Sequence, residues 1–246
     1  MFHHREGLPA DWEPIIEESF GAWPQFTADE QDELVAIADW LLKHKHWEAS
    51  NGFELHDEIR VTVAIEAAVP ILALDTDYYR EVSAIVVYPT TIMSRGTYAG
   101  PVMGTVTDSV IPVLGQAHDR RGPVIIAWDD ARASARNPGR GRNVVFHEFA
   151  HKIDMLDDMT DGTPPLPKNR LARWVDVCTE VYESLGEGVP RPPLDMYGAT
   201  NVAEFFAVAT ECFFDAPVPL KQHEPNLYGV LRDFYRQDPA ERMGVR

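Results

Sequence analysis

The sequence predicts a single α+β domain that is mostly helical and contains a small mixed sheet. Apolar residues recur at helical spacing through much of its 246 residues, and two short runs rich in β-branched residues, 83–88 and 122–128, predict the strands. A chain of this length with 45% apolar residues can bury one sizeable core. Helices flanking a small sheet around one core are typical of the α+β class.

The N-terminal segment, residues 1–28, is predicted to be irregular and docked on the body, because prolines alternate there with large aromatic residues. The first helix follows Thr27, since residues 27–30 have the form of a capping box, and it ends near His46. A second helix is expected from about residue 56 to residue 68, where Pro70 ends or bends it.

The remaining elements follow from the same patterns. Between the two strands we expect strand pieces at 104–107 and 110–114, and residues 131–142 are predicted to form a turn and loop. The predicted helices of the second half are 143–154, 171–185, 202–214 and 227–235, and residues 236–246 are predicted to be a frayed tail.

The composition excludes several classes of protein. The chain has 22 basic and 39 acidic residues, and its net charge of −17 disfavours direct binding to nucleic acid or anionic lipid. It contains no apolar run long enough to span a membrane, and its N-terminus lacks the apolar core of a signal peptide. We therefore predict a cytoplasmic protein. Cys178 and Cys212 are expected to be buried free thiols, with a single bridge as the alternative.

The segment 143–154 carries the clearest chemical signal, His147-Glu148-x-x-His151. Residues four apart lie on one helical face, so the two imidazoles can point at one Zn²⁺ ion. Glu148 can then act as a general base towards a water molecule on that ion. A buried structural histidine pair is the competing interpretation. The apolar stripe that includes Val145, Phe149 and Ile153 lies on another face, which favours the metal site.

A catalytic zinc needs a third protein ligand, and five acidic residues are candidates for it. Asp157 follows His151 at a spacing known from metal sites, and Glu180 and Glu183 lie on the next predicted helix. Glu204 and Glu211 lie seven apart in an apolar helix, where an unpaired carboxylate is costly to bury. Glu204 is also placed to form an N-terminal cap with Asn201. The residues alone leave Glu204 and Glu211 nearly tied.

Two segments, 143–154 and 197–207, resemble the Mlc titration factor A family of zinc peptidases, and they also resemble the anthrax lethal factor protease domain. In both families a tyrosine precedes the ligand glutamate by seven residues, a spacing that selects Glu204, with Tyr197 as the tyrosine. The resemblance extends weakly over residues 30–215.

The resemblance implies a gluzincin-like zinc metallopeptidase acting on peptides or proteins, with aminopeptidase activity as one form. It would use one Zn²⁺, held by His147, His151 and Glu204, with Glu148 as the general base. Tyr197 would donate a hydrogen bond to the oxyanion. The resemblance also implies that a Mlc-like transcriptional repressor could be a partner.

The sequence allows more than one interpretation of two further features and of the function. Asp154 could orient a ligand histidine, pair with Lys152 or an arginine, or be a helix-end charge. The strand at 123–128 is equally an interior strand or an edge to which a peptide substrate adds. A repressor-binding protein with weak hydrolase activity and a non-peptide zinc amidohydrolase are the alternative functions.

Overall fold

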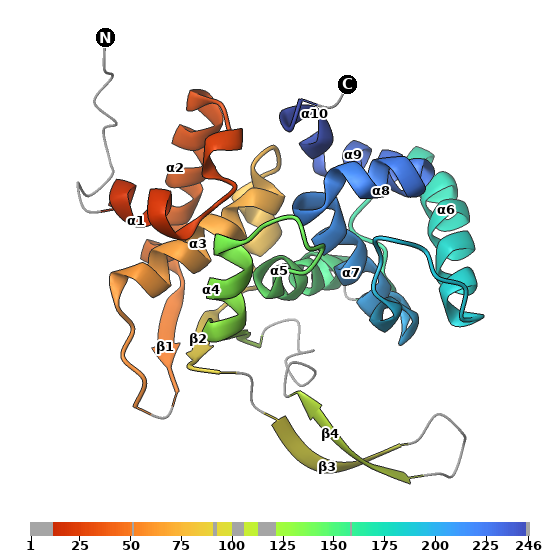
Figure 1. Ribbon diagram of the computed structural model, residues 1–246, viewed down its shortest axis with the longest axis horizontal. Coiled ribbons are helices and arrows are strands. Elements are labelled where there is room, and N and C mark those ends of the chain that lie inside the picture. The colour runs from red at the N-terminus through yellow and green to blue at the C-terminus, as the bar shows by residue number, and fades with distance from the viewer. Residues whose placement is uncertain are drawn as a thin grey trace.

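The computed structural model describes residues 12–50, 52–90, 93–99, 106–112, 122–157 and 159–244. The protein is mostly helical with a small sheet, which confirms the predicted α+β class (Figure 1). The helices are α1 (Trp12–Ser19), α2 (Ala28–His44), α3 (Asp57–Ile71), α4 (Trp128–Arg136), α5 (Val144–Asp154), α6 (Lys168–Gly186), α7 (Val202–Asp215), α8 (Pro217–His223), α9 (Pro225–Tyr235) and α10 (Pro239–Arg242). The strands are β1 (His46–Ala49), β2 (Ala84–Tyr88), β3 (Met93–Ala99), β4 (Val106–Pro112) and β5 (Val124–Ala127). Among the described residues, no helix combines the length and apolarity needed to span a bilayer.

The main sheet has three parallel strands in the order β1-β2-β5. Ile85 of β2 pairs with Trp47 of β1 on one side and with Val124 of β5 on the other. Among the described residues this sheet holds parallel strands alone, so the prediction of a mixed sheet is wrong; each connection back to it is a long crossover rather than a tight hairpin. β3 and β4 form a separate antiparallel pair. β4 overlaps both predicted strand pieces, 104–107 and 110–114, whose outer ends lie outside the described residues.

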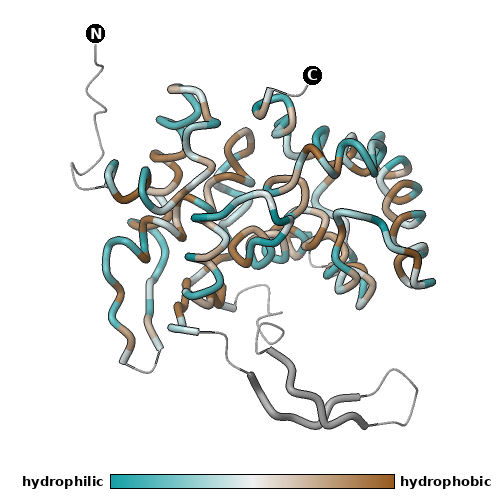
Figure 2. Tube along the Cα trace, viewed as in Figure 1, coloured by the Kyte–Doolittle hydropathy of each residue, from teal (hydrophilic) through white to brown (hydrophobic). Residues whose placement is uncertain are grey.

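The core is built around α3, in which every residue from 61 to 71 is buried. A helix that is apolar on all sides is stable only when other elements surround it. α2 packs along α3 on one side, and α5 contacts it on another. Figure 2 shows the hydrophobic residues gathered in these inner helices. α5 also packs along α7, so the segments 143–154 and 202–214 lie side by side, as a shared site requires.

The predicted start of the first long helix is confirmed. The Thr27 side chain accepts a hydrogen bond from the Glu30 backbone N–H at 3.3 Å, and the Glu30 carboxylate accepts one from the Thr27 N–H at 2.8 Å. The irregular N-terminal segment is corrected in part, because α1 lies within residues 1–28. Phe20 and Trp23 are buried in the core, so the described part of this segment is docked as expected. Residues 1–11 lie outside the described residues.

Two further predictions are wrong. The predicted loop at 131–142 begins as a helix, because α4 extends to Arg136 and buries Ala131 and Ala135. The predicted frayed tail is ordered through Gly244: α10 buries Ala240, and the Gln237 side-chain amide donates to the Val69 carbonyl at 2.8 Å. Residues 245–246 lie outside the described residues.

Both cysteines are free thiols, as predicted, although Cys178 is only half-buried while Cys212 is buried. The Cys212 thiol lies 3.5 Å from the Gly141 carbonyl, to which it can donate. This contact joins α7 to the loop before α5.

Candidate metal centre

The helix that carries the two histidines begins with a side-chain cap. Asn143 has extended backbone angles, and its Oδ1 accepts the Phe146 N–H at 3.0 Å. This satisfies one of the backbone donors left over at a helix N-terminus. The predicted apolar stripe of α5 is fully buried, which leaves His147 and His151 on a different face, towards α7.

α7 is capped in the same way, because Asn201 Oδ1 accepts the Glu204 N–H at 2.9 Å. The cap accounts for the backbone of Glu204 and leaves its carboxylate available for another partner. Glu204 is 4% exposed and Glu211 is 8% exposed, in a helix that is otherwise mostly apolar. Burying a carboxylate without a partner costs several kcal/mol, so both side chains must be held by specific contacts.

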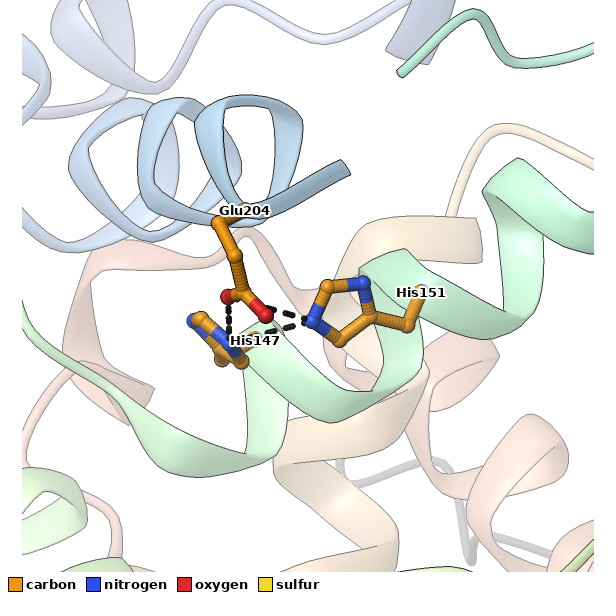
Figure 3. Close-up of side chains that lie close together, drawn as sticks. All are labelled: His147, His151 and Glu204. Atoms are coloured by element: carbon orange, nitrogen blue, oxygen red, sulfur yellow. Dashed lines mark hydrogen bonds and ion pairs between the residues drawn. The ribbon is translucent and has the colours of Figure 1, made fainter. Parts of the chain in front are cut away.

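Three side-chain atoms from these helices converge on one point (Figure 3). His147 Nε2 lies 3.1 Å from His151 Nε2 and 3.0 Å from Glu204 Oε2, and His151 Nε2 lies 3.5 Å from the same oxygen. Ligands about 2.1 Å from a tetrahedral zinc would be about 3.4 Å apart. The three atoms therefore fit one metal ion with little rearrangement. Among the described residues, they form the one cluster of this kind.

Glu211 occupies a different place from Glu204. Its Oε1 accepts from His147 Nδ1 at 2.7 Å, and its Oε2 accepts the Asn143 N–H at 2.6 Å. In the neutral imidazole that binds a metal, a hydrogen on Nδ1 leaves the lone pair on Nε2, the nitrogen that faces His151 and Glu204. Glu211 is thus positioned to orient His147 rather than to bind the metal itself.

The other acidic residues considered as third ligands lie apart from the centre. Asp157, Glu180 and Glu183 are exposed, and Glu180 forms an ion pair with Arg191 at 3.4 Å. Their arrangement is that of solvated surface carboxylates.

The side chains of the centre shift one another's pKa values strongly. Burial lowers the pKa of His147, but its contacts with Glu204 and Glu211 outweigh burial and raise the pKa to about 10. Burial alone would raise the pKa of Glu204, but the contacts with His147 and His151 hold it well below its usual range. Glu204 therefore stays an ionised acceptor at neutral pH, as a metal ligand must be.

Glu148 is 4% exposed, and burial raises its pKa to about 8; His147 acts in the opposite direction, and Glu204 adds to the increase. Its Oε1 is buried and accepts no hydrogen bond among the described residues. A carboxylate with a pKa near neutrality can gain and lose a proton at neutral pH, and an oxygen without a hydrogen-bond partner is available to accept that proton. This is the property expected of a general base.

These shifts predict a pH dependence for the metal-free protein. The pKa of His147 rises from 6.5 in the unfolded chain to about 10 in the folded protein. His147 therefore stabilises the folded protein fully below pH 6.5, and this stabilisation is lost as the pH rises to 10. The pKa of Glu148 is raised from 4.5 to about 8, so the stability of the folded protein also falls as the pH rises towards 8 and Glu148 ionises. We expect the melting temperature in chelator to fall between pH 6.5 and pH 10. His147→Gln should flatten this slope, and an unchanged slope in that variant would contradict the assignment.

Tyr197 lies in the 3₁₀ turn η5 (Met196–Ala199), which Asp195 caps by accepting the Tyr197 N–H at 2.9 Å. Its ring centroid is 6.2 Å from that of His147, and 47% of the residue is exposed. Burial and the carboxylates of Glu204 and Glu148 raise the pKa of Tyr197 to about 12, so its hydroxyl remains a donor. Tyr197 and His147 both line a cavity of about 570 Å³, a size typical of ligand sites.

Asp154 is fully buried, and its Oδ2 accepts the Gly162 N–H at 3.2 Å. Burial raises the pKa of Asp154 to about 7. The contact ties the end of α5 to the loop that lies against Val202, the first residue of α7. Asp154 therefore connects the two helices that carry the centre, and a role in orienting a histidine stays a prediction.

Gly162 cannot accept a side chain. Its φ is +73°, and a Cβ there would lie 2.3 Å from the Val202 carbonyl oxygen. We expect Gly162→Ala to displace the start of α7 and to weaken metal binding through Glu204. Gly188→Ala is the matched control, because φ is +79° and a Cβ would meet no described atom within 4 Å. The control should lose about 1–2 kcal/mol of stability from backbone strain, with normal metal affinity. Equal metal affinity in both variants would refute this prediction.

Two histidines and a glutamate converging from two helices, with a second glutamate buried beside them, form the type of centre that metallopeptidases use. The chain belongs to the family described as glucose-regulated metallo-peptidase M90, which it matches over residues 2–236. It is 33% identical to the uncharacterized protein slr2042 of Synechocystis over 236 residues, 94% of this chain and 86% of that relative. It is 32% identical to Mlc titration factor A of Salmonella gallinarum and of Salmonella typhi over 225 residues, 89% of this chain and 83% of each relative. The family resemblance predicted from the two segments is confirmed.

Proposed function

We propose that residues 1–246 act as a single zinc-dependent peptidase domain of the gluzincin type. The observation that carries this proposal is the convergence of His147 Nε2, His151 Nε2 and a Glu204 oxygen, which lie 3.0–3.5 Å apart. Two nitrogen ligands and one carboxylate ligand form a common catalytic set for zinc and leave a position for water or substrate. Membership of a metallopeptidase family supports the same assignment.

Zinc bound at this centre would supply an activated water and polarise the scissile carbonyl. Glu148 takes the proton of the attacking water, which its raised pKa allows it to hold, and then delivers the proton to the leaving amine. The Tyr197 O–H donates a hydrogen bond to the oxygen of the carbonyl as negative charge develops there. Glu211 keeps the Nδ1 hydrogen of His147 in place throughout.

The position of β5 supports an extended peptide as the substrate. Among the described residues, β5 pairs with β2 alone, so its other edge can offer main-chain hydrogen bonds to a peptide. β5 also contacts α5, the helix that carries His147 and Glu148. A peptide added at this edge would run beside the centre, and the 570 Å³ cavity would take one of its side chains.

The proposal is tested with a peptide library and a set of aminoacyl anilides. We expect hydrolysis that a chelator abolishes and that stoichiometric zinc restores. The cleavage positions distinguish an aminopeptidase, which cuts after the first residue, from an endopeptidase. Chelator-resistant hydrolysis, or hydrolysis confined to non-peptide amides, would overturn the proposal.

Tyr197→Phe is expected to lower kcat by about 10²–10³ with little change in KM, because the hydroxyl acts mainly on the charge that develops during the reaction. Tyr182→Phe is the matched control, since Tyr182 packs edge-on against Phe205 of α7 at 5.9 Å between ring centroids. The control should keep full activity. A Tyr197→Phe variant with normal kcat would leave that tyrosine a packing role only.

Binding of a Mlc-like repressor is a second candidate function, favoured by the name Mlc titration factor A of two relatives. The two functions separate in one experiment. A pull-down with a Mlc-like repressor would compare wild type, Glu148→Ala and chelator-treated protein. Capture that is independent of both zinc and Glu148 would indicate a binding function separate from hydrolysis, and no capture would exclude this candidate.

A further inference from the structure

A further buried carboxylate lies outside the metal centre, on α3. Glu66 is fully buried within a run of apolar residues. Its Oε1 accepts a hydrogen bond from the Asn143 side-chain amide at 2.5 Å, and its Oε2 has no hydrogen-bond partner among the described residues. An acid in such a position is costly and needs an explanation beyond core packing.

Asn143 connects Glu66 to the centre, because its side chain and its backbone N–H make hydrogen bonds to three different helices. Its Oδ1 caps α5 through the Phe146 N–H, and its Nδ2 donates to Glu66. Its backbone N–H donates to Glu211 Oε2 at 2.6 Å. The position of this one residue therefore depends on α3, α5 and α7 together.

The chain of contacts ends on a metal-ligand candidate, since the other oxygen of Glu211 accepts from His147 Nδ1 at 2.7 Å. We propose that Glu66 is a positioning residue of the metal centre: it holds the Asn143 side chain, so that the Asn143 N–H keeps Glu211 on Nδ1 of His147. The inference rests on the proposed function, because it concerns how His147 presents Nε2 to a metal. Partners that orient a metal-binding histidine typically change metal affinity by about 10–100-fold.

The buried position of Glu66 favours its neutral acid form. Burial raises its pKa to about 8, the Asn143 hydrogen bond acts in the opposite direction, and Asp215 adds to the increase. A neutral glutamic acid and a glutamine offer the same carbonyl-type acceptor to the Asn143 amide. The role is therefore distinguished by variants that keep or remove this acceptor.

The experiment measures zinc affinity of the full chain by competition with a chromophoric chelator, together with the visible spectrum of the cobalt-loaded protein. Glu66→Gln keeps the acceptor and should match wild type in both. Glu66→Leu removes it and should weaken zinc binding by about 10–100-fold and alter the cobalt spectrum. Thr62→Val is the matched control, because Thr62 is fully buried one turn earlier on α3 and its Oγ1 has no hydrogen-bond partner among the described residues. It should leave zinc affinity unchanged.

A second variant covers the case in which Glu66→Leu fails to fold. Asn143→Ser keeps a good helix cap but is too short to reach Glu66, so it should show the same loss of affinity. Wild-type zinc affinity in a folded Glu66→Leu or Asn143→Ser variant would overturn the inference. A wild-type protein that binds no zinc would instead overturn the proposed function, so the two failures are distinct.

Discussion

Glu148→Ala is expected to keep zinc and to lose hydrolysis by about 10²–10⁴ in kcat, the range typical of a general base. Glu148 is buried beside the centre but lies outside the cluster of possible ligand atoms, which consists of His147, His151 and Glu204. Removing its carboxylate should therefore spare the metal while taking away the group that accepts the proton. The measurement pairs metal content by mass spectrometry with peptide hydrolysis.

The control for this variant is Glu180→Gln, because Glu180 is an exposed carboxylate paired with Arg191 on the surface. It should be indistinguishable from wild type in metal content and rate. Full activity in Glu148→Ala would contradict the mechanism. Loss of metal in that variant would instead make Glu148 part of the ligand set.

Glu204→Gln is expected to lose zinc, with an affinity reduced by more than about 100-fold, because a ligand matters more than the residues that orient ligands. Glutamine has the size of glutamate but lacks the charge that faces His147 and His151. Glu211→Gln is the matched comparison on the same helix, and it should weaken zinc by only about 10–100-fold. Zinc affinities of both variants, measured side by side, test the ligand set.

The reverse order of the two effects would exchange the roles of Glu204 and Glu211. Equal effects would mean that neither carboxylate has a preferred place at the metal. Far-ultraviolet circular dichroism of both variants separates loss of zinc from loss of fold.

The predicted helices with strong periodicity were confirmed, whereas several short elements were missed, and β1 and α4 show the physical reasons. β1 has the sequence His-Trp-Glu-Ala, and its strand conformation comes from pairing with β2. α4 buries only Ala131 and Ala135, so its apolar signal is weak. Arg132 and Arg136 both pair with Glu58, a contact between segments far apart in the chain. Both elements depend on partners that local sequence does not reveal.

The candidate site likewise has one part that the sequence pattern predicts and another part that it does not. The spacing of His147 and His151 was sufficient to place two imidazoles together. The sequence pattern could not decide whether Glu204 or Glu211 is the third ligand, because both lie in one apolar helix. The family resemblance favoured Glu204. The structure adds that Glu211 reaches the Nδ1 side of His147.

Gly162 and Glu66 were not predicted to matter, since their roles come from contacts with residues far away in the sequence. For Glu66, the sequence offered one indication of a special role, which is that a glutamate interrupts an otherwise apolar run. An acid in such a run is costly to bury, which marks it as a residue with a specific partner.

We propose that His147, His151 and Glu204 together hold one zinc ion. The most direct test is anomalous diffraction at the zinc absorption edge from crystals of the zinc-loaded protein. We expect a single strong peak within bonding distance of Nε2 of both histidines and of a Glu204 oxygen, with Glu211 still on His147 Nδ1. A peak on Glu211, or no peak between α5 and α7, would contradict this proposal.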